Sequence, residues 1–324
     1  MPQVASACDL CDGSSFETIS RLDRRGNPLE TVVCTTCGLV AHARIPTEAD
    51  LEHYYAAEYR RDYHGEVTPS ARRVVRAWRN GERLVRQLSD YFSPGDRVFE
   101  VGAGIGCTVK AFELAGCDAA GIDPGAGFQR FARQRLLARV ERQSLFDVTP
   151  AGMYDLVLLV HVIEHFSSPR RALEHLCELV RPGGRVYVEC PNLSAPFARY
   201  TRMFHFAHVH NFTPRTLAML AGRCGFHVER QFSDRDDPNL QMLLVRRGTA
   251  RLSIDRDSYD YTLSALRQAG SAAYHLRRRY LAARIRKLAG YVEEHLTARY
   301  RLRQILARCA ESTAAAGRAP RRAA

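Results

Sequence analysis

The sequence predicts an α/β protein with a doubly wound, mostly parallel sheet, a small cysteine-rich module before it and helices after it. Short apolar runs at residues 98–101 and 156–160 have the composition of buried parallel strands. Helical patterns follow both runs, and a glycine-rich turn joins the first run to its helix. This alternation of strand and helix is typical of a parallel sheet covered by helices.

The glycine-rich turn is the strongest local signal for a ligand site. Gly102, Gly104 and Gly106 alternate along the tight connection between strand and helix. Without Cβ atoms, this connection lets a ligand lie against backbone amide groups. Asp123 ends the next predicted strand, where its carboxylate can accept hydrogen bonds from a ribose diol.

The spacing of this turn separates two kinds of nucleotide-binding fold. The fingerprint for NAD or FAD is GxGxxG, whereas this chain has GxGxG with Glu100 directly before it. The pattern resembles the first motif of class I S-adenosylmethionine (SAM) dependent methyltransferases. The resemblance implies a Rossmann-like, seven-stranded sheet whose last strand is antiparallel. It also implies that SAM binds at Glu100, Gly102, Gly104, Gly106 and Asp123.

Two further motifs extend the resemblance. YDLVLLVHVIEH at residues 154–165 and RPGG at 181–184 are similar to motifs of ubiquinone-biosynthesis O-methyltransferases. The resemblance places Ser144 near the adenine ring and His161 at the cofactor. His165 is a candidate general base, since an unperturbed histidine titrates near neutrality.

His161 and His165 lie four residues apart, so a catalytic metal must be considered. The zinc-protease pattern HExxH is absent, since Glu164 does not adjoin His161. Some ubiquinone-type methyltransferases hold a divalent cation with the equivalent Glu-His and further acids. Because His161 stands where another acid is expected, we predict no catalytic metal.

Four cysteines near the N-terminus have the spacing of a zinc ribbon. Cys8-x2-Cys11 and Cys34-x2-Cys37 are separated by 22 residues, and each pair can direct two thiolates at one tetrahedral ion. The alternative is four unligated thiols. All four positions are cysteine, so we expect structural Zn²⁺, with strands at residues 16–22 and 29–33 between the pairs.

A helical linker follows the ribbon. Thr47 and Asp50 form an approximate capping box, and a second helix is predicted at residues 72–91. The linker also carries four tyrosines, Tyr54, Tyr55, Tyr59 and Tyr63. Aromatic residues spaced in this way are usually packing residues. This order of ribbon, linker and catalytic domain, however, resembles bacterial methyltransferases that act on sugars and other small metabolites, in which tyrosines of the linker can line the active-site mouth.

Histidines recur near the end of the predicted sheet. In related small-molecule methyltransferases, a histidine-containing segment lies over the substrate, and HVHNFTPRTL matches it at His208 and His210. Either could deprotonate an acceptor; the alternative is that they hold loop backbone. The remaining predicted elements are helices at 128–142 and 213–224 and strands at 144–146, 185–189, 226–232 and 239–246.

The tail carries most of the net charge of +12. Residues 251–324 hold sixteen Arg or Lys side chains against six acids, and residues 259–310 have the periodicity of basic amphipathic helices. We expect them to pack on the catalytic domain or on a second subunit of a homodimer. Peripheral contact with anionic lipid or an acidic polymer is the alternative. The last dozen residues have a disordered composition.

Together these patterns predict four regions: a zinc ribbon (1–45), a helical linker (46–92), a SAM-binding domain (93–250) and a basic extension (251–324). No apolar run approaches the roughly 20 residues of a membrane helix. Ten cysteines, free or metal-bound, fit a reducing compartment, so we expect a cytoplasmic protein.

The resemblance implies transfer of a methyl group to a hydroxyl, or carbon, of a small metabolite, sugar or glycan intermediate. One alternative is methylation of ribosomal or transfer RNA. It would require a basic ribbon surface, but basic residues do not outnumber acids in residues 1–45, so we expect no nucleic-acid partner. A second alternative is a non-catalytic, SAM-binding scaffold whose tail binds a partner.

Overall fold

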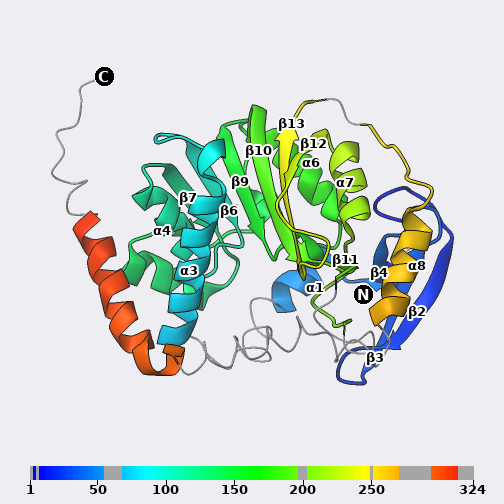
Figure 1. The fold of residues 1–324 in the computed structure, drawn as a ribbon, viewed down its shortest axis with the longest axis horizontal. Coiled ribbons are helices and arrows are strands. Elements are labelled where there is room, and N and C mark those ends of the chain that lie inside the picture. Colours follow the sequence, from blue (N-terminus) through cyan, green and yellow to red (C-terminus); the bar gives the residue numbers. More distant parts are fainter. Residues whose placement is uncertain are drawn as a thin grey trace. The chain divides into compact units, whose positions relative to one another are not determined.

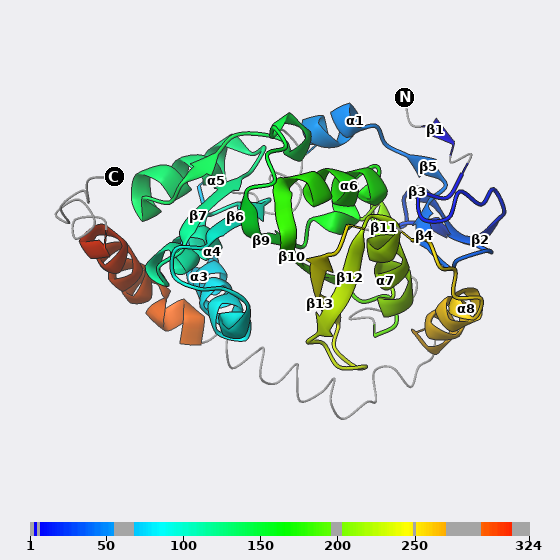
Figure 2. The ribbon, with the colours of Figure 1, turned by 90° about the horizontal axis from the view of Figure 1, so that it is seen from above.

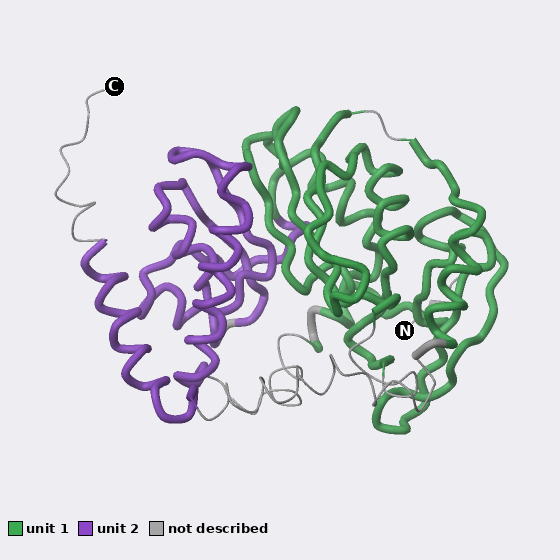
Figure 3. Tube along the Cα trace, in the orientation of Figure 1, with its two compact units in different colours: residues 1–54, 148–281 green, residues 55–147, 282–324 purple. Residues whose placement is uncertain are grey.

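The computed structural model describes residues 3–4, 7–54, 68–195, 203–248, 251–269 and 293–312. The chain divides into two compact units (Figure 3). Unit 1 contains residues 1–54 and 148–281, and unit 2 contains residues 55–147 and 282–324.

The central sheet has seven strands in the order β12-β13-β10-β9-β6-β7-β8. Strand β13 (Asn239–Arg246) runs antiparallel to both neighbours, β10 (Val180–Pro191) and β12 (Phe226–Gln231). The predicted α/β class, with seven strands and the last strand antiparallel, is confirmed.

Unit 2 contains three parallel strands, β6 (Arg97–Val101), β7 (Asp118–Ile122) and β8 (Val140–Glu141), of which Figure 1 labels β6 and β7. Helix α4 (Cys107–Leu114) connects β6 to β7. Helix α3 (Ala71–Gln87) packs closely on α4: a Cβ added at Gly81 would lie 3.0 Å from the Cys107 carbonyl oxygen. Gly81 therefore lets the two helices approach.

The predicted helix at 128–142 and strand at 144–146 are wrong in their bounds. Helix α5 (Ala126–Phe131) continues through a π-helical turn and stops at Leu137, which has φ 56°. Val140 then pairs with Gly121 as β8, while Leu145–Asp147 forms a 3-10 turn. The exposed arginines after Phe131 have the spacing of a solvent-facing helix surface, which led to the longer predicted helix. The chain instead forms a strand at Val140, because this β-branched side chain is buried in the sheet.

A helix over residues 293–312 belongs to unit 2 and packs against α3. Arg76 of α3 pairs with Glu294 at 2.6 Å, and Arg308 pairs with Glu82 at 3.2 Å. The expected helical tail is therefore present in this part of the chain. Residues 270–292 and 313–324, which include the predicted disordered end, lie outside the described residues.

Unit 1 contains the parallel pair β9 (Tyr154–Val160) and β10, with β13 and β12 beyond them. Helices α6 (Pro169–Leu179) and α7 (Pro214–Arg223) lie side by side in this unit (Figure 2). The side chain of Ser168 caps the start of α6 and that of Thr213 caps the start of α7, and a proline follows each cap.

The cysteine-rich region of unit 1 forms a second sheet in the order β11-β4-β3-β2. Strands β2 (Phe16–Leu22) and β3 (Pro28–Cys34) form the predicted hairpin, and β4 (Val40–His42) joins β3. The fourth strand, β11 (His210–Asn211), comes from the histidine-rich segment and pairs with β4. The two short strands β1 (Gln3–Val4) and β5 (Arg44–Ile45) pair separately.

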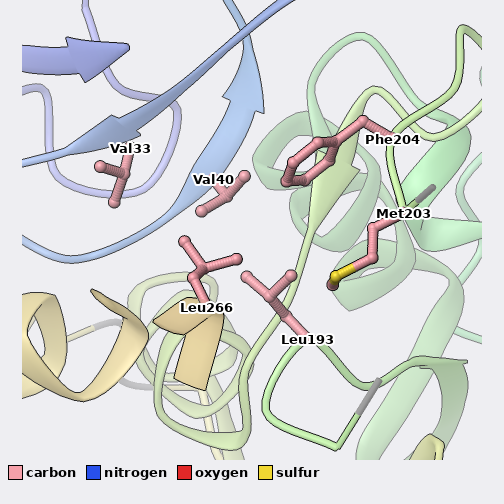
Figure 4. Close-up of a cluster of buried hydrophobic side chains, with 6 residues drawn as sticks. All are labelled: Val33, Val40, Leu193, Met203, Phe204 and Leu266. Carbon is pink, nitrogen blue, oxygen red and sulfur yellow. The ribbon is translucent and has the colours of Figure 1, made fainter. Parts of the chain in front are cut away.

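One hydrophobic cluster unites three parts of unit 1 (Figure 4). Val33 and Val40 come from the cysteine-rich sheet, and Leu266 comes from α8 (Ser258–Ala269). Thr262 of α8 also donates a hydrogen bond to the Gly38 carbonyl at 3.0 Å. These parts therefore share one core with Leu193, Met203 and Phe204.

Helix α1 (Glu48–His53) begins with the predicted capping box between Thr47 and Asp50. Tyr54 is buried and packs edge-to-face on Phe206 at a centroid distance of 5.0 Å. The other three linker tyrosines lie outside the described residues. Within the described ranges, each helix is too short or too polar to cross a bilayer.

Candidate active site

The glycine turn of unit 2 needs left-handed backbone at alternate residues. Gly102, Gly104 and Gly106 have φ angles of 72°, 52° and 79° as the chain passes from β6 to α4. Residues with a Cβ rarely adopt this conformation, so glycine is required at each position.

Asp123 directly follows β7, and its carboxylate contacts this turn. Its Oδ2 accepts a hydrogen bond from the Gly104 amide at 3.0 Å, and its Oδ1 accepts one from the Gly125 amide at 2.8 Å. The structure therefore brings together the glycine turn and the carboxylate that the sequence predicts as cofactor ligands.

Gly104 and Gly106 have different surroundings. A Cβ at Gly104 would have only Asp123 Oδ2 and the Gly102 carbonyl oxygen within 4 Å, both at 3.9 Å. A Cβ at Gly106 would lie 2.7 Å from the Ala132 Cβ. Gly104 therefore leaves space for a ligand, whereas Gly106 allows close packing within unit 2.

Glu100 lies buried one residue before the valine that ends β6. Burial raises its pKa to about 8, with a hydrogen bond from Thr108 acting in the opposite direction. Its Oε2 atom is buried and has no hydrogen-bond partner among the described residues. Such an oxygen suits a ligand that carries an N–H donor, and together with Asp123 and the space at Gly104 it fits the ammonium and ribose groups of SAM.

Ser144 also belongs to unit 2. It directly precedes the 3-10 turn Leu145–Asp147, and its backbone amide donates to Asp147 Oδ2 at 3.3 Å. Its assignment to the adenine ring stays a prediction.

A second group of candidate residues lies in unit 1, after the end of β9. His161 has φ 56°, an unusual conformation for a residue with a side chain. Its Nδ1 is 3.5 Å from Glu164 Oε1, and its Nε2 is 3.9 Å from Glu189 Oε1. Glu189 is buried at the end of β10 and accepts a hydrogen bond from Tyr187 at 2.8 Å.

Glu164 is a buried carboxylate with histidines beside it. Neither of its oxygens accepts a hydrogen bond in the described structure, although Oε1 lies 3.8 Å from His165 Nε2. Burial alone would raise the pKa of Glu164, but His165 and His161 outweigh burial and hold that pKa below its usual range. The carboxylate is therefore charged at neutral pH.

His165 is fixed by the loop that carries the other histidines. Its Nδ1 donates to the Ala207 carbonyl at 2.6 Å, which leaves Nε2 without the proton in the neutral ring. The ring centroids of His165 and His208 are 5.1 Å apart, and those of His208 and His205 are 3.8 Å apart with their planes tilted by 48°. Burial lowers the pKa of His208 and lowers that of His205 to about 3, so both are neutral.

Glu164, His165 and His208 offer ligand atoms that lie within 4.8 Å of one another. A carboxylate and two neutral imidazoles are a donor set that a divalent cation can use. The prediction of no catalytic metal did not foresee this grouping, because His208 is distant in sequence.

His210 has a different environment from His208. It is buried in β11, and its Nδ1 donates to the Phe166 carbonyl at 3.2 Å, while its backbone pairs with Ala41. Burial lowers the pKa of His210. The hydrogen bond to Phe166 matches the alternative that this histidine holds loop backbone.

The four ribbon cysteines converge as their spacing predicts. Cys8 Sγ lies 3.5 Å from Cys37 Sγ, and Cys11 Sγ lies 3.6 Å from Cys34 Sγ. A tetrahedral zinc ion with bonds of about 2.3 Å separates its sulfur ligands by about 3.7 Å, whereas a disulfide needs about 2.05 Å. The four thiols therefore fit a Zn²⁺ ion.

Sequence reasoning missed three residues near the histidines. Glu189 ends a buried strand, and an acid in the apolar run VYVEC could have marked it. His205 lies in the segment already noted for histidines. Asp9, between the first two cysteines, contacts α6, and no sequence signal points to that contact.

Residues 71–231 match the family model described as a methyltransferase domain, so this segment, about half of the chain, is a methyltransferase domain.

The curated relatives that match this chain include two enzymes of one name. The ubiquinone biosynthesis O-methyltransferase of Pectobacterium atrosepticum is 29% identical over 108 residues, which cover 31% of this chain and 45% of the relative. The enzyme of that name from Bordetella avium is 32% identical over 105 residues, covering 30% of this chain and 44% of the relative. The chain thus spans under half the length of these relatives.

Similar solved structures also include methyltransferases. Magnesium protoporphyrin IX methyltransferase from Synechocystis PCC 6803 with bound S-adenosylhomocysteine has a TM-score of 0.46 and 20% identity, covering 61% of this chain and 99% of the other. The 1,6-didemethyltoxoflavin-N1-methyltransferase of Burkholderia thailandensis has a TM-score of 0.42 and 18% identity, covering 52% and 78%.

Proposed function

We propose that this chain is a SAM-dependent methyltransferase that transfers a methyl group to a hydroxyl, or carbon, of a small metabolite, sugar or glycan intermediate. The observation that carries the proposal is the open glycine turn of a methyltransferase domain, held by Asp123 through the Gly104 amide. The orphaned oxygen of Glu100 adds a place for the ammonium group of SAM.

SAM supplies an already activated methyl group, so the protein's task is to position the acceptor and remove one proton. His165 is the proposed base, because its Nδ1–H is engaged by the Ala207 carbonyl and its Nε2 can accept a proton. The charged Glu164 would stabilise the imidazolium that forms. His208, a neutral imidazole, can orient the acceptor hydroxyl.

Two observations favour a small acceptor over RNA. The two curated relatives described above are named ubiquinone biosynthesis O-methyltransferases. In addition, basic residues do not outnumber acids in residues 1–45, so the ribbon lacks the charge for binding phosphate backbones. We further propose that the four cysteines bind a structural Zn²⁺, supported by their close approach.

Calorimetric titration of SAM into the full chain tests the cofactor assignment. Gly104→Val would fill the open side of the turn, and we expect it to abolish SAM binding while the fold is retained. Gly95→Val is the matched control: Gly95 lies in the same unit, also has positive φ (94°), and has no atom within 4 Å of an added Cβ. An equal loss of affinity in both variants, or unchanged affinity in Gly104→Val, would refute the assignment.

The acceptor class is tested by following S-adenosylhomocysteine release from SAM. Phenolic metabolites, sugar nucleotides and ribosomal or transfer RNA would be compared at matched concentrations. We expect turnover with a hydroxyl-bearing small molecule. Turnover with RNA alone would overturn the proposed substrate class while leaving the cofactor assignment intact.

A further inference from the structure

Three residues separate His165 from α6, and each of them is held by a residue distant in sequence. The Phe166 carbonyl accepts from His210, and the Ser167 amide donates to Glu48 of α1 at 3.1 Å. Ser168 Oγ donates to Asp9 Oδ1 at 2.7 Å. The segment that joins His165 to α6 is therefore held at each of its residues by a hydrogen bond to another part of unit 1.

Asp9 makes a second contact at the same place. Its Oδ2 accepts a hydrogen bond from the Arg170 amide at 2.8 Å, while Ser168 Oγ accepts from the Arg171 amide at 3.1 Å. The carboxylate thus shares with Ser168 the task of satisfying the first free amides of α6. A negative charge at a helix N-terminus is also favoured by the helix dipole.

Asp9 belongs to the turn between the first two cysteines of the ribbon. It stands between Cys8 and Cys11, in a turn closed by a 2.8 Å hydrogen bond from the Cys8 amide to the Gly13 carbonyl. Arg223 of α7 donates to the Leu10 carbonyl at 2.6 Å, which docks the same turn on the neighbouring helix. The geometry of this cysteine turn therefore determines where the Asp9 carboxylate lies.

We propose that Asp9 is a positioning residue that transmits the metal-bound shape of the cysteine turn to the Glu164–His165 segment. Zinc would then govern the orientation of the proposed base as well as the stability of the ribbon. This inference rests on the proposed function for the role of His165. The physical link, from cysteine turn to carboxylate to helix start, is independent of SAM and of the acceptor.

Asp9→Asn tests the link in the zinc-loaded full chain. Asparagine can still accept from the Arg170 amide through its oxygen, but its nitrogen only donates, so the hydrogen bond that Ser168 donates to the carboxylate is lost together with the negative charge at the start of α6. Hydrogen exchange at the amides of residues 167, 168, 170 and 171 should accelerate roughly five- to tenfold, as expected for loss of a helix cap. The NMR resonances of the His165 ring, assigned with His165→Gln, should change position at the same time.

Asp12→Asn is the matched control. Asp12 lies in the same turn and pairs with Arg170 and Arg223 through their side chains, without contacting the amides of α6. Its φ of 60° is one that asparagine tolerates. We expect this variant to leave both the amide exchange and the His165 ring resonances unchanged.

Zinc content and SAM affinity are measured on every variant to separate the possible failures. If Asp9→Asn loses zinc, Ser168→Ala breaks the same link from the helix side and takes its place in the comparison. Unchanged amide exchange and unchanged His165 ring resonances in a zinc-loaded Asp9→Asn or Ser168→Ala protein would overturn the inference, as would an equal effect of Asp12→Asn. Failure of wild-type SAM binding would refute the proposed function without altering the exchange result.

Discussion

The two groups of candidate residues are built in contrasting ways. In unit 2 the proposed cofactor cradle is mostly backbone, and its members, from Glu100 to Asp123, lie within one strand-helix-strand unit. In unit 1 the histidine cluster consists of side chains from separate segments, and residues as distant as Asp9 and Glu48 hold it. The first group depends on local conformation, and the second depends on how the chain folds back on itself.

The largest expected effect tests the dependence of unit 1 on the proposed zinc ion. Cys34→Ser should abolish zinc binding and destabilise unit 1 by several kcal/mol, because structural zinc contributes on the order of 10 kcal/mol in small zinc modules. Cys177→Ser, at a half-buried free thiol in the same unit, should leave the zinc content unchanged. Metal analysis and thermal unfolding measure both. A wild-type protein that binds no zinc when zinc is supplied would contradict this expectation.

The next prediction separates a proposed base from a histidine that holds backbone. His165→Gln should lower the single-turnover rate of methyl transfer by about 10²–10⁴ with SAM affinity unchanged. His210→Ala should instead reduce the free energy of unfolding by about 1–3 kcal/mol, because it removes a buried hydrogen bond to Phe166. Similar rate losses in both variants would remove this distinction.

A smaller effect is expected within the glycine turn. Gly106→Ala places a Cβ 2.7 Å from Ala132 in left-handed backbone, and should cost about 2–3 kcal/mol of stability. Gly104→Ala has open space, and should cost about 1–2 kcal/mol from backbone strain while weakening SAM binding more than Gly106→Ala does. Denaturant unfolding and calorimetry give the two quantities. The reverse order would mean that Gly106 faces the ligand.

The last prediction concerns pH, and its effect appears only over a limited pH range. Burial raises the pKa of Glu100 to about 8, so the folded protein keeps this carboxyl protonated at pH values where the unfolded chain has already released the proton. The free energy of unfolding is therefore highest at acidic pH and falls as pH rises toward 8. Between pH 6 and pH 8 the wild type should lose on the order of 2 kcal/mol from this group. Glu100→Gln should remove that slope. Parallel unfolding curves for the two proteins across this range would argue against a protonated Glu100.

The shape of the glycine turn and its contact with Asp123 could be predicted because their information is local. Alternating glycines, a preceding acid and an aspartate at the next strand end define the geometry around Gly104 without help from the rest of the chain. The paired cysteines are equally local. The grouping of His165 with His208 could not be derived in this way, because the return of residues 203–208 depends on the core around Val40 and Phe204. The arginine-rich stretch after Phe131 shows the same limit, since pairing with Gly121 overrides its helical pattern.

The pairing of β4 with β11 has a consequence for the order in which the protein can form. During synthesis on the ribosome, the ribbon's hairpin emerges early, but the strand that covers the edge of β4 appears only when His210 and Asn211 have been made. Until then β4 presents unpaired backbone groups that another chain could bind. A fragment ending at residue 45 would keep that edge exposed, so the N-terminal module is best produced together with the segment that completes its sheet.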